Sequence, residues 1–479
     1  MNSSFSSRRL AAIVFIVCML CLPSQLWADA LADRIDGLLD SPNLEHGIQA
    51  VVVKSMDTGD ILYERNADLT MMPASNLKLL VSAAALDLLG PAYTYKTNVS
   101  APRQIGWDGI VRGDLVLRGA GDPTLSTSDL ADLARQLKSA GLLKITGDIL
   151  IAEGLFDAPS IGQGWAWDYL PYYYAAPAGA LNLNRNTVEV YVSPGKSVGS
   201  AALVRTVPAT NLLKVESTAV TDRSGSGKSL EVYRKLGTNT ITVSGSIAIN
   251  AKPGDYEELI TVTEPGLYAG EVFKTQMVKQ GITVVGGVKK GRTPEDAQLI
   301  ATHSSPPLSE ILALLNKPSD NLIAEVLLKT IGAASGRLGT TESGIAVEMQ
   351  FLKKAGAETD AVRIVDGSGL SRLNNITAYG LLAVLEHMYH HKHGQVYLES
   401  LPIAGVDGTL RNRMKGTAAQ GNVRAKSGYV TGASSLSGFV DTRSGKTLAF
   451  SILMNNHLCS NSKAKAIQNK ICEVLATLP

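Results

Sequence analysis

The stretch PASNLKLLVSAAALDLLG, Pro73 to Gly90, places a serine three residues before a lysine at the start of an apolar helix. The residues from Leu77 to Leu89 are apolar nearly all round, so the helix is predicted to be buried inside a domain. Residues three apart on a helix share a face, so the Ser75 hydroxyl and the Lys78 amine are expected to lie close together. A buried lysine loses its charge readily, and only the neutral amine can take a proton from a hydroxyl.

The Ser75/Lys78 pair also has a purely structural interpretation. Ser75 can cap the helix while the Lys78 stem lies along apolar surface, and the S-x-x-K pattern is common by chance. On the other side, Pro73 suits a first helical turn, and a helix N-terminus favours the negative charge that develops near an attacking serine. The pair alone therefore leaves catalysis open.

Two further polar clusters follow along the chain. Ser319-Asp320-Asn321 lies at a Pro-marked junction between two predicted helices, and Lys426-Ser427-Gly428 lies on a predicted strand in NVRAKSGYVTGASS. The order S-x-x-K, S-D-N, K-S-G matches the motifs of penicillin-binding proteins and class A β-lactamases, except that serine replaces the threonine of K-T-G. Serine keeps the hydroxyl, so the same chemistry is expected. Three motifs in order are far rarer by chance than one, which favours the catalytic interpretation.

The sequence between the motifs narrows the resemblance to one family. Three stretches, DGSGLSRLNNIT (366–377), LPIAGVDGTLRNRM (401–414) and GWAWDYLPYYYAAPAGALNLNRN (164–186), resemble the class C low-molecular-mass penicillin-binding proteins, peptidase family S13. These are D-alanyl-D-alanine carboxypeptidases/endopeptidases, and the resemblance covers nearly the whole mature chain. It implies an α+β fold: a serine acyl-transferase domain with a five-stranded antiparallel sheet and flanking helices, plus a β-rich insertion of one or two smaller domains.

The organisation of the chain fits this fold. A hairpin is predicted from Ile48 to Tyr63, with its turn at Asp57-Thr58-Gly59, and short alternating strands fill the middle of the chain. Helices return after Pro307, and a strand pair precedes a last helix that begins near Asn461. We therefore predict a catalytic domain in two parts, residues 31–92 and 303–479, interrupted by one or more inserted domains over 93–302.

Five residues are implied to be catalytic. The resemblance implies that Ser75 attacks the carbonyl between two D-alanine units, or between D-alanine and a cross-linked diamino acid. It implies that Lys78 takes the proton of the Ser75 hydroxyl. Ser319 relays a proton toward the leaving amine, and Asn321 holds the peptide amide of the substrate. Lys426 binds the terminal carboxylate of the substrate. Asp320 is assigned only a structural role.

A second group is implied to bind substrate. Ser427 contacts the carboxylate with Lys426, and the backbone N–H groups of Ser75 and Tyr429 form the oxyanion hole. Trp165, Asp168 and Tyr173 match a pocket of the insertion where an acidic group meets the free amine of diaminopimelate. Arg372 is implied to line the same pocket. The substrate-binding residues are thus Ser427, Gly428, Tyr429, Trp165, Asp168, Tyr173 and Arg372.

The N-terminus has the three parts of a secretory signal over residues 1–30. Arg8 and Arg9 precede an apolar run from Leu10 to Pro23, and Ala28 and Ala30 form an A-x-A cleavage pattern. The run is too short to span a bilayer comfortably, so we expect a soluble periplasmic protein without a membrane span. Only Cys459 and Cys472 remain after cleavage. The predicted last helix separates them beyond disulfide reach, so two free thiols are expected.

Other features argue against other functions. The 45 Lys and Arg residues nearly balance the 43 Asp and Glu residues, so no nucleic-acid partner is expected. SGSGKS at 224–229 lacks the first glycine of a phosphate loop, because position 222 is Asp222. The histidines between His387 and His393 are interpreted as an exposed helix end rather than a metal site. The sequence around Ser368 lacks the G-x-S-x-G elbow of a serine nucleophile, so Ser368 is interpreted as a loop residue rather than a second nucleophile. No metal or cofactor is predicted.

The predicted function is therefore a penicillin-sensitive serine D,D-carboxypeptidase/D,D-endopeptidase. Its partners would be peptidoglycan peptides that end in D-Ala-D-Ala or are cross-linked through D-Ala, and β-lactam antibiotics. Two alternatives stay open: a β-lactamase or esterase of the same fold, and a non-catalytic cell-wall binding protein. No E-x-x-L-N stretch supplies the deacylating glutamate of class A β-lactamases. All the polar catalytic positions are filled, which favours an enzyme over a binding protein.

Overall fold

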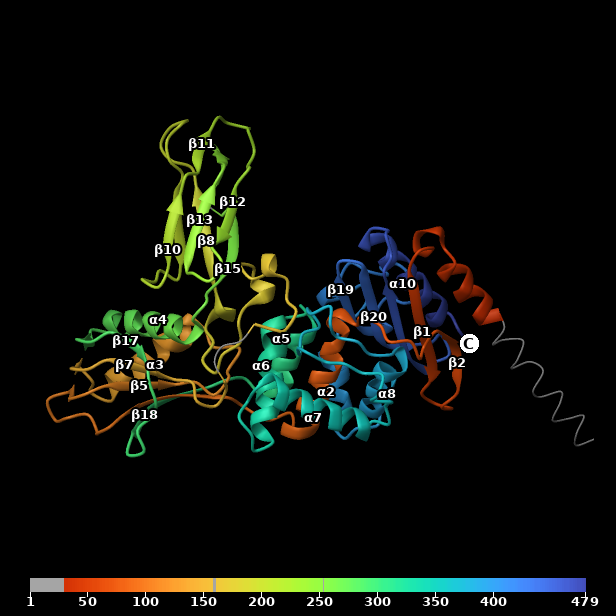
Figure 1. Ribbon diagram of the computed structural model, residues 1–479, viewed down its shortest axis with the longest axis horizontal. Helices are drawn as coiled ribbons and strands as arrows, with labels where there is room; N and C mark the ends of the chain where they lie inside the picture. The colour runs from red at the N-terminus through yellow and green to blue at the C-terminus, as the bar shows by residue number, and fades with distance from the viewer. Residues whose placement is uncertain (1–29, 158–160, 253) are drawn as a thin grey trace, which may run out of the picture.

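The computed structural model describes residues 30–157, 161–252 and 254–479. The molecule is elongated: one end holds a sheet flanked by helices, and the other end holds a β-rich body from which a pair of small sheets extends as an arm (Figure 1). The predicted signal peptide lies, apart from its last residue, outside the described residues. Within the described residues, no helix is long and apolar enough to cross a membrane.

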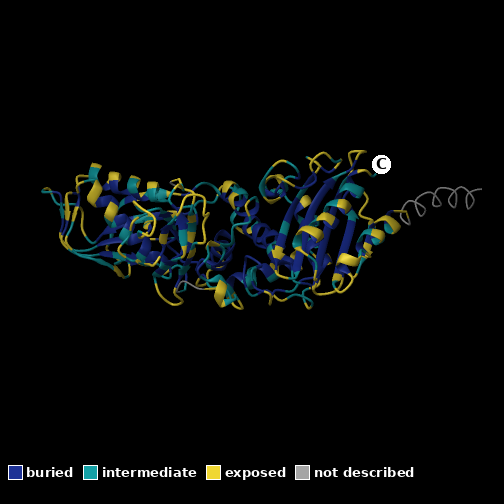
Figure 2. Cartoon of the chain, turned by 90° about the horizontal axis from the view of Figure 1, so that it is seen from above, coloured by how far each residue is buried: buried dark blue, intermediate teal, exposed yellow. Residues whose placement is uncertain are grey.

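The first body is built on a five-stranded antiparallel sheet, which confirms the predicted fold class. The strands lie in the order β19-β20-β21-β1-β2, so the hairpin near the N-terminus pairs with strands from the other end of the chain. Their bounds are β1 Ile48–Ser55, β2 Ile61–Arg65, β19 Val423–Val430, β20 Ala433–Asp441 and β21 Thr447–Asn455. Nearly every residue of β20 and β21 is buried, because helices cover both faces of the sheet (Figure 2).

The helices are divided between the two faces. The C-terminal helix α10 (Asn461–Ala476) packs on β20, and α8 (Ala378–Tyr389) packs on β21 and on α2. Helix α2 (Lys78–Leu89) is buried on all sides from Lys78 to Leu86, as its apolar sequence predicts. The remaining elements of this body are η1 Pro42–Leu44, η2 Ala74–Leu77, α5 Leu308–Asn316, α6 Asn321–Ala334, α7 Thr341–Lys354, α9 Gly394–Ser400 and η6 Gly408–Leu410.

The middle of the chain has a hydrophobic core of its own, whose buried members all lie between Val99 and Ala301. Two helices, α3 Thr127–Ser139 and α4 Pro265–Lys279, pack against each other beside a sheet of order β17-β7-β5-β3-β18. The arm contains the sheets β10-β13-β12 and β11-β14, and the sheet β15-β8-β9 joins it to the body. Insertion boundaries at 93 and 302 stay a prediction.

The bounds of the middle elements follow. The strands are β3 Lys96–Ala101, β4 Ile110–Val111, β5 Leu115–Arg118, β6 Lys144–Ile145, β7 Ile149–Ala152, β8 Thr187–Ser193, β9 Leu203–Val207, β10 Lys214–Ser217, β11 Val220–Asp222, β12 Glu231–Arg234, β13 Thr240–Ser244, β14 Ser246–Ala248, β15 Glu257–Thr261, β16 Thr283–Val284, β17 Val288–Lys290 and β18 Gln298–Ser304. Three 3-10 turns are η3 Trp167–Tyr169, η4 Tyr173–Ala175 and η5 Asn184–Asn186.

Two smaller predictions concern cysteines and metals. Cys459 and Cys472 are both free thiols, which confirms the prediction, because Cys472 is buried inside α10 while Cys459 precedes that helix. Among the described residues, no group of three or more His, Cys, Asp or Glu side chains is arranged to hold a metal ion. His391 contacts Asp87 instead, with its Nε2 atom 3.2 Å from the Asp87 Oδ1 atom.

Candidate active site

The serine of the first motif lies on a 3-10 turn, not on the α-helix that the sequence predicted. The turn η2 covers Ala74–Leu77, and α2 begins only at Lys78. Side chains three residues apart are eclipsed in a 3-10 turn, so Ser75 and Lys78 lie directly above one another. The Lys78 Nζ atom lies 2.9 Å from the Ser75 Oγ atom. The tighter turn therefore brings the predicted pair into hydrogen-bonding contact.

Two glycines from distant parts of the chain fix this turn. Ala74 adopts a positive φ of 47°, which is unusual for a residue with a side chain. A Cβ atom on Gly428 of β19 would lie 2.8 Å from both the Pro73 oxygen and the Ser75 nitrogen, and a Cβ atom on Gly369 would overlap with the Ala74 carbonyl. Only glycine allows β19 and the 366–371 loop to approach the turn so closely. The turn is thus fixed from both sides.

We expect Gly369→Ala to destabilise the protein and to slow acylation of Ser75. Gly369 has a φ of +77°, and its added methyl group would displace the Ala74 carbonyl. Gly336→Ala is the matched control, because Gly336 has a φ of +83° and no atom within 4 Å of the added Cβ. The control should cost about 1–2 kcal/mol of backbone strain, and Gly369→Ala about 1–3 kcal/mol more from overpacking. Chemical denaturation measures both, and equal losses would contradict the prediction.

Lys78 is fully buried and makes three hydrogen bonds. Besides Ser75, its Nζ atom donates to the Asn321 Oδ1 atom and to the Ser368 carbonyl oxygen, both at 2.6 Å. Burial lowers the pKa of Lys78 to about 8, although the carboxylates of Asp366, Glu325 and Asp320 oppose the shift. About a tenth of the lysine is therefore a neutral amine at pH 7, which makes it available as a base.

The second motif joins the helices α5 and α6. Ser319 has a positive φ of 68°, and the side chain of Asp320 caps α6 by accepting a hydrogen bond from the Ile323 nitrogen at 2.9 Å. Asp320 also forms an ion pair with Arg185 of the middle of the chain at 2.7 Å. Asn321 is the first residue of α6, and this position directs its amide toward Lys78. The cap therefore holds the two polar side chains of the motif in place.

The third motif lies on β19, the edge strand of the sheet. Lys426 is fully buried, and its Nζ atom donates to the Ser319 Oγ atom and to the Ser427 carbonyl, both at 2.8 Å. Burial and the neighbouring Lys78 ammonium lower the pKa of Lys426 well below its usual value. Ser427 contacts Thr409 of η6 at 2.8 Å. Because β19 is an edge strand, no further strand of this sheet pairs with its outer side; there the Ala425 N–H donates to the Pro402 carbonyl, whereas an oxyanion hole at Tyr429 requires an N–H that is not used in pairing.

Three distant motifs therefore meet around one hydroxyl, and comparisons with known proteins identify the family of the chain. The family model described as "D-Ala-D-Ala carboxypeptidase 3 (S13) family" matches residues 31–478. The chain belongs to this family. A D-alanyl-D-alanine carboxypeptidase of Actinomadura sp. (strain R39) is 38% identical, over 98% of this chain and 90% of that protein.

Solved structures of the S13 family superimpose on nearly the whole molecule. Penicillin-binding protein 4 (DacB) from Haemophilus influenzae gives a TM-score of 0.82 at 27% identity, covering 93% of this chain and 99% of that one. The same protein complexed with a β-lactam gives a TM-score of 0.75 at 27% identity, covering 91% and 97%. The protein is thus a serine hydrolase of the S13 family, with the fold of its solved relative.

The remaining predicted site residues are more widely spread. Tyr173 lines a cavity of about 590 Å³ together with Ser319, Asp320 and Asn321. Arg372 lines a different cavity, next to Tyr429, because its guanidinium donates to the Thr431 carbonyl. Tyr173 and Arg372 thus line separate cavities, and a shared substrate pocket for the two residues stays a prediction.

Trp165 and Asp168 line neither of these cavities. The Trp165 indole donates to the Asp366 Oδ2 atom at 2.8 Å, so it contacts the catalytic body rather than open space. Asp168 is exposed on the 3-10 turn η3. A role for Asp168 in binding substrate stays a prediction.

Sequence reasoning missed several groups that contact the motifs. The Asn321 amide donates to the Tyr174 carbonyl at 2.6 Å, which links the middle of the chain to the site. Ser368 was interpreted only as a loop residue, yet its carbonyl accepts a hydrogen bond from Lys78. Any residue type can supply a backbone carbonyl, so the sequence does not predict these contacts. Only the two glycines of DGSGL indicated that another part of the chain could approach the backbone closely at this loop.

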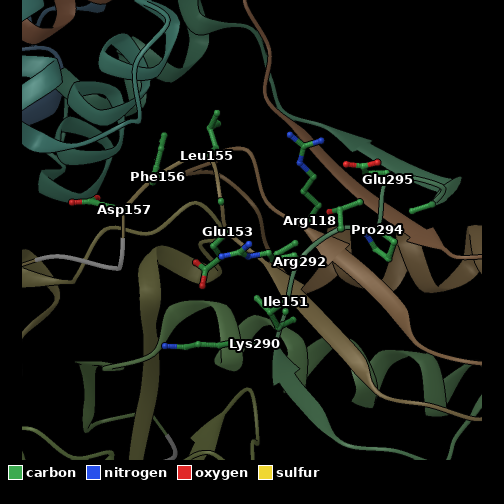
Figure 3. Close-up of a pocket in the computed structure, with 15 residues that line it drawn as sticks. Arg118, Ile151, Glu153, Leu155, Phe156, Asp157, Lys290, Arg292, Pro294 and Glu295 are labelled. Carbon is green, nitrogen blue, oxygen red and sulfur yellow. The ribbon is translucent and has the colours of Figure 1, made fainter.

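A larger cavity lies away from this chemistry. It has a volume of about 940 Å³, and Figure 3 shows Arg118, Glu153 and Arg292 among its lining residues. Glu153 and its neighbours lie on the segment that follows β7, and Lys290 and Arg292 lie at the end of β17 and just beyond it. None of the lining residues belongs to the three motifs, so size alone does not identify the active site.

Proposed function

We propose that this protein cleaves the D-Ala-D-Ala bond at the end of peptidoglycan stem peptides through an acyl-enzyme on Ser75. Membership of the S13 family supports the reaction type. The observation that carries the proposal is the contact of a buried lysine with a single serine hydroxyl, at 2.9 Å. Asn321 accepts a hydrogen bond from Lys78, and Ser319 accepts one from Lys426.

The proposed acylation uses each motif once. The neutral Lys78 amine takes the proton of Ser75, and the Ser75 oxygen bonds to the carbonyl carbon of the scissile peptide. The backbone N–H groups of Ser75 and Tyr429 stabilise the negative oxygen that develops. The C–N bond then breaks, and Ser319 relays the proton that Lys78 took from Ser75 to the departing amine of D-alanine, so that Lys78 and Ser319 return to their starting states. Water later attacks the ester, which releases the shortened peptide and restores Ser75.

Lys426 is proposed to recognise the terminal carboxylate. Burial and Lys78 disfavour its charge in the free enzyme, and an incoming carboxylate would restore the charge as a charge-assisted hydrogen bond forms. Ser427 adds a hydroxyl on the same strand, two residues before Tyr429. This arrangement favours peptides with a free C-terminal carboxylate, and it also suits the carboxylate of a β-lactam. The β-lactam complex of the relative from Haemophilus influenzae supports the second ligand class.

We expect the acylation rate to rise with pH between pH 6 and pH 8. A base must be deprotonated to act, and the pKa of Lys78 is lowered from 10.5 to about 8. Below this pKa the neutral fraction, and with it the second-order rate constant, should change about tenfold for each pH unit. The rate constant for acylation by a fluorescent penicillin at each pH measures this. A midpoint near 10 would mean that the lysine is not desolvated during the reaction.

The cleavage of cross-links is a further part of the proposal. The same acyl-enzyme forms whether the leaving amine belongs to D-alanine or to a cross-linked diaminopimelate, so the two activities share one site. The N-terminal sequence supports export to the periplasm, where both substrates occur. Asp168 and Tyr173 would contact the diaminopimelate amine.

Defined muropeptides test this proposal. Incubation with a monomeric pentapeptide should release D-alanine, and incubation with a D-Ala-cross-linked dimer should yield monomers, as chromatography of the products would show. Ser75→Ala should leave both substrates intact. Cleavage of the pentapeptide alone would limit the protein to carboxypeptidase activity. No cleavage of either, despite binding, would favour the alternative of a cell-wall binding protein, and rapid turnover of penicillin would favour a β-lactamase.

A further inference from the structure

Three buried carboxyl groups lie behind the active-site lysine, and the proposed reaction uses none of them. Glu325 belongs to α6, Glu348 to α7, and Asp366 begins the loop from 366 to 371. All three are at most 5% exposed. Buried carboxyl groups are costly unless they are paired or hydrogen-bonded, so their contacts indicate what they do.

Glu325 binds the backbone that supports Lys78. Its Oε1 atom accepts hydrogen bonds from the Ser368 nitrogen at 2.8 Å and the Gly367 nitrogen at 3.1 Å, and its Oε2 atom lies 3.2 Å from the same Gly367 nitrogen. The carbonyl oxygen of Ser368 then accepts from the Lys78 Nζ atom at 2.6 Å. A single residue of the loop therefore separates the carboxylate of Glu325 from the amine of Lys78.

Asp366 secures the rest of this loop. Its Oδ1 atom accepts hydrogen bonds from the Gly369 nitrogen and the Asn374 amide, each at 2.8 Å. Its Oδ2 atom accepts from the Ser371 nitrogen at 2.7 Å and from the Trp165 indole at 2.8 Å. The loop is thus held at both ends, and Gly369 lies against the Ala74 carbonyl next to the nucleophile.

Glu348 is different. Neither of its carboxyl oxygens has a hydrogen-bond partner among the residues that the structure describes. Burial, together with the nearby Glu325 and Asp366 carboxylates, raises the pKa of Glu348 well above its usual value. Burial therefore favours the neutral form of Glu348, and neither of its carboxyl oxygens forms a hydrogen bond with the described residues of the loop.

We propose that Glu325 is a positioning residue for acylation, because its carboxylate fixes the Gly367–Ser368 backbone so that the Ser368 carbonyl holds Lys78 against Ser75. The inference rests on the proposed role of Lys78 as the base. A misplacement of about 1 Å in a catalytic group costs about 10²-fold in rate, so the support of the carbonyl matters even though Glu325 does not touch substrate.

The charge of Glu325 has a second effect on the same lysine. The charged or titratable groups that face Lys78 are Asp366, Glu325 and Asp320, which favour its ammonium form, and Lys426, which disfavours it. Burial and Asp366 raise the pKa of Glu325 to about 7, while its bonds to Gly367 and Ser368 oppose the rise. Removal of this negative charge should lower the pKa of Lys78 further, so the neutral amine would persist at lower pH.

Three variants of the full mature chain separate position from charge. Glu325→Ala removes the support of the loop, and its acylation rate constant with fluorescent penicillin should fall about 10²-fold. Glu325→Gln keeps a similar volume and one accepting oxygen, so it should lose less rate, and the acidic limb of its pH–rate profile should move to lower pH. Glu348→Gln is the matched control: it replaces a buried neutral carboxyl with a neutral amide, so the rate and the profile should stay as in the wild type.

The outcomes discriminate clearly. Wild-type rate and pH profile in both Glu325 variants would overturn the inference. A second result would also overturn it: Glu325→Gln keeps the wild-type pH profile, and both Glu325 variants lose as much rate as Glu348→Gln does. The carboxyl cluster would then have only a structural role. If Glu325→Ala does not fold, as judged by its far-UV circular dichroism, the comparison of Glu325→Gln with Glu348→Gln decides alone. A wild-type protein that is never acylated would instead refute the proposed function.

Discussion

Ser75→Ala should abolish labelling by fluorescent penicillin and stop the hydrolysis of D-Ala-D-Ala peptides. Ser75 is the hydroxyl that contacts Lys78, on the turn fixed by Gly369 and Gly428. Removal of a nucleophile from a serine hydrolase lowers kcat by a factor on the order of 10⁶, because the covalent route is lost. The two measurements are in-gel fluorescence after saturation with the drug and release of D-alanine from a pentapeptide.

Ser82→Ala is the control for this experiment. Ser82 lies on the same helix α2 and is buried, and its hydroxyl bonds to the Asn316 side chain rather than to any motif residue. This variant should be labelled as the wild type is. Labelling of Ser75→Ala at the wild-type level would place the nucleophile elsewhere, and loss of labelling in both variants would indicate damage to the helix instead.

Lys78→Met should reduce the acylation rate by about 10²–10⁴-fold, the range that general base catalysis contributes. Methionine has a similar length and no charge, so it fits a site that already disfavours the lysine charge. The variant keeps Ser75 and the oxyanion hole, so slow labelling should persist. Time-resolved labelling gives the rate constant.

Lys78→Arg tests whether charge alone explains the effect. Arginine keeps a cation near Asn321 and the Ser368 carbonyl, but its guanidinium does not deprotonate in proteins. It should therefore acylate as slowly as the methionine variant. A rate near that of the wild type in Lys78→Arg would show that the lysine acts as a cation rather than as a base.

Much of the fold could be predicted from the sequence, because the signals are local. The continuous apolar runs in Ile48–Ser55 and in α2 are typical of a buried strand and of a buried helix, and both elements occur where they were expected. The turn at Asp57-Thr58-Gly59 separates β1 from β2. The start of the nucleophile helix is the exception. The positive φ of Ala74 comes from packing against Gly369 and Gly428, which a single-sequence pattern does not reveal.

The candidate site was predicted as a set of side chains, and the structure added the backbone groups. Ser75, Lys78 and Asn321 were identified from their motifs, and they are in contact. The carbonyls of Ser368 and Tyr174 were missed because any residue type can supply a carbonyl. The position of Arg372 also depends on tertiary contacts, because its guanidinium donates to the Thr431 carbonyl in the turn between β19 and β20.

The sequence by itself determined which chemical groups are present and in what order: a serine with a lysine three residues on, an S-D-N cluster and a K-S-G strand. The apolar helix predicted a buried lysine, but the tertiary structure alone decided which groups contact the Lys78 amine. Its partners Asn321 and Ser368 lie 243 and 290 residues away along the chain, and the carboxyl cluster around Glu325 comes from three separate elements. The size of a pKa shift depends on everything packed around a group, so the local pattern predicted burial but not the contacts that set the shift.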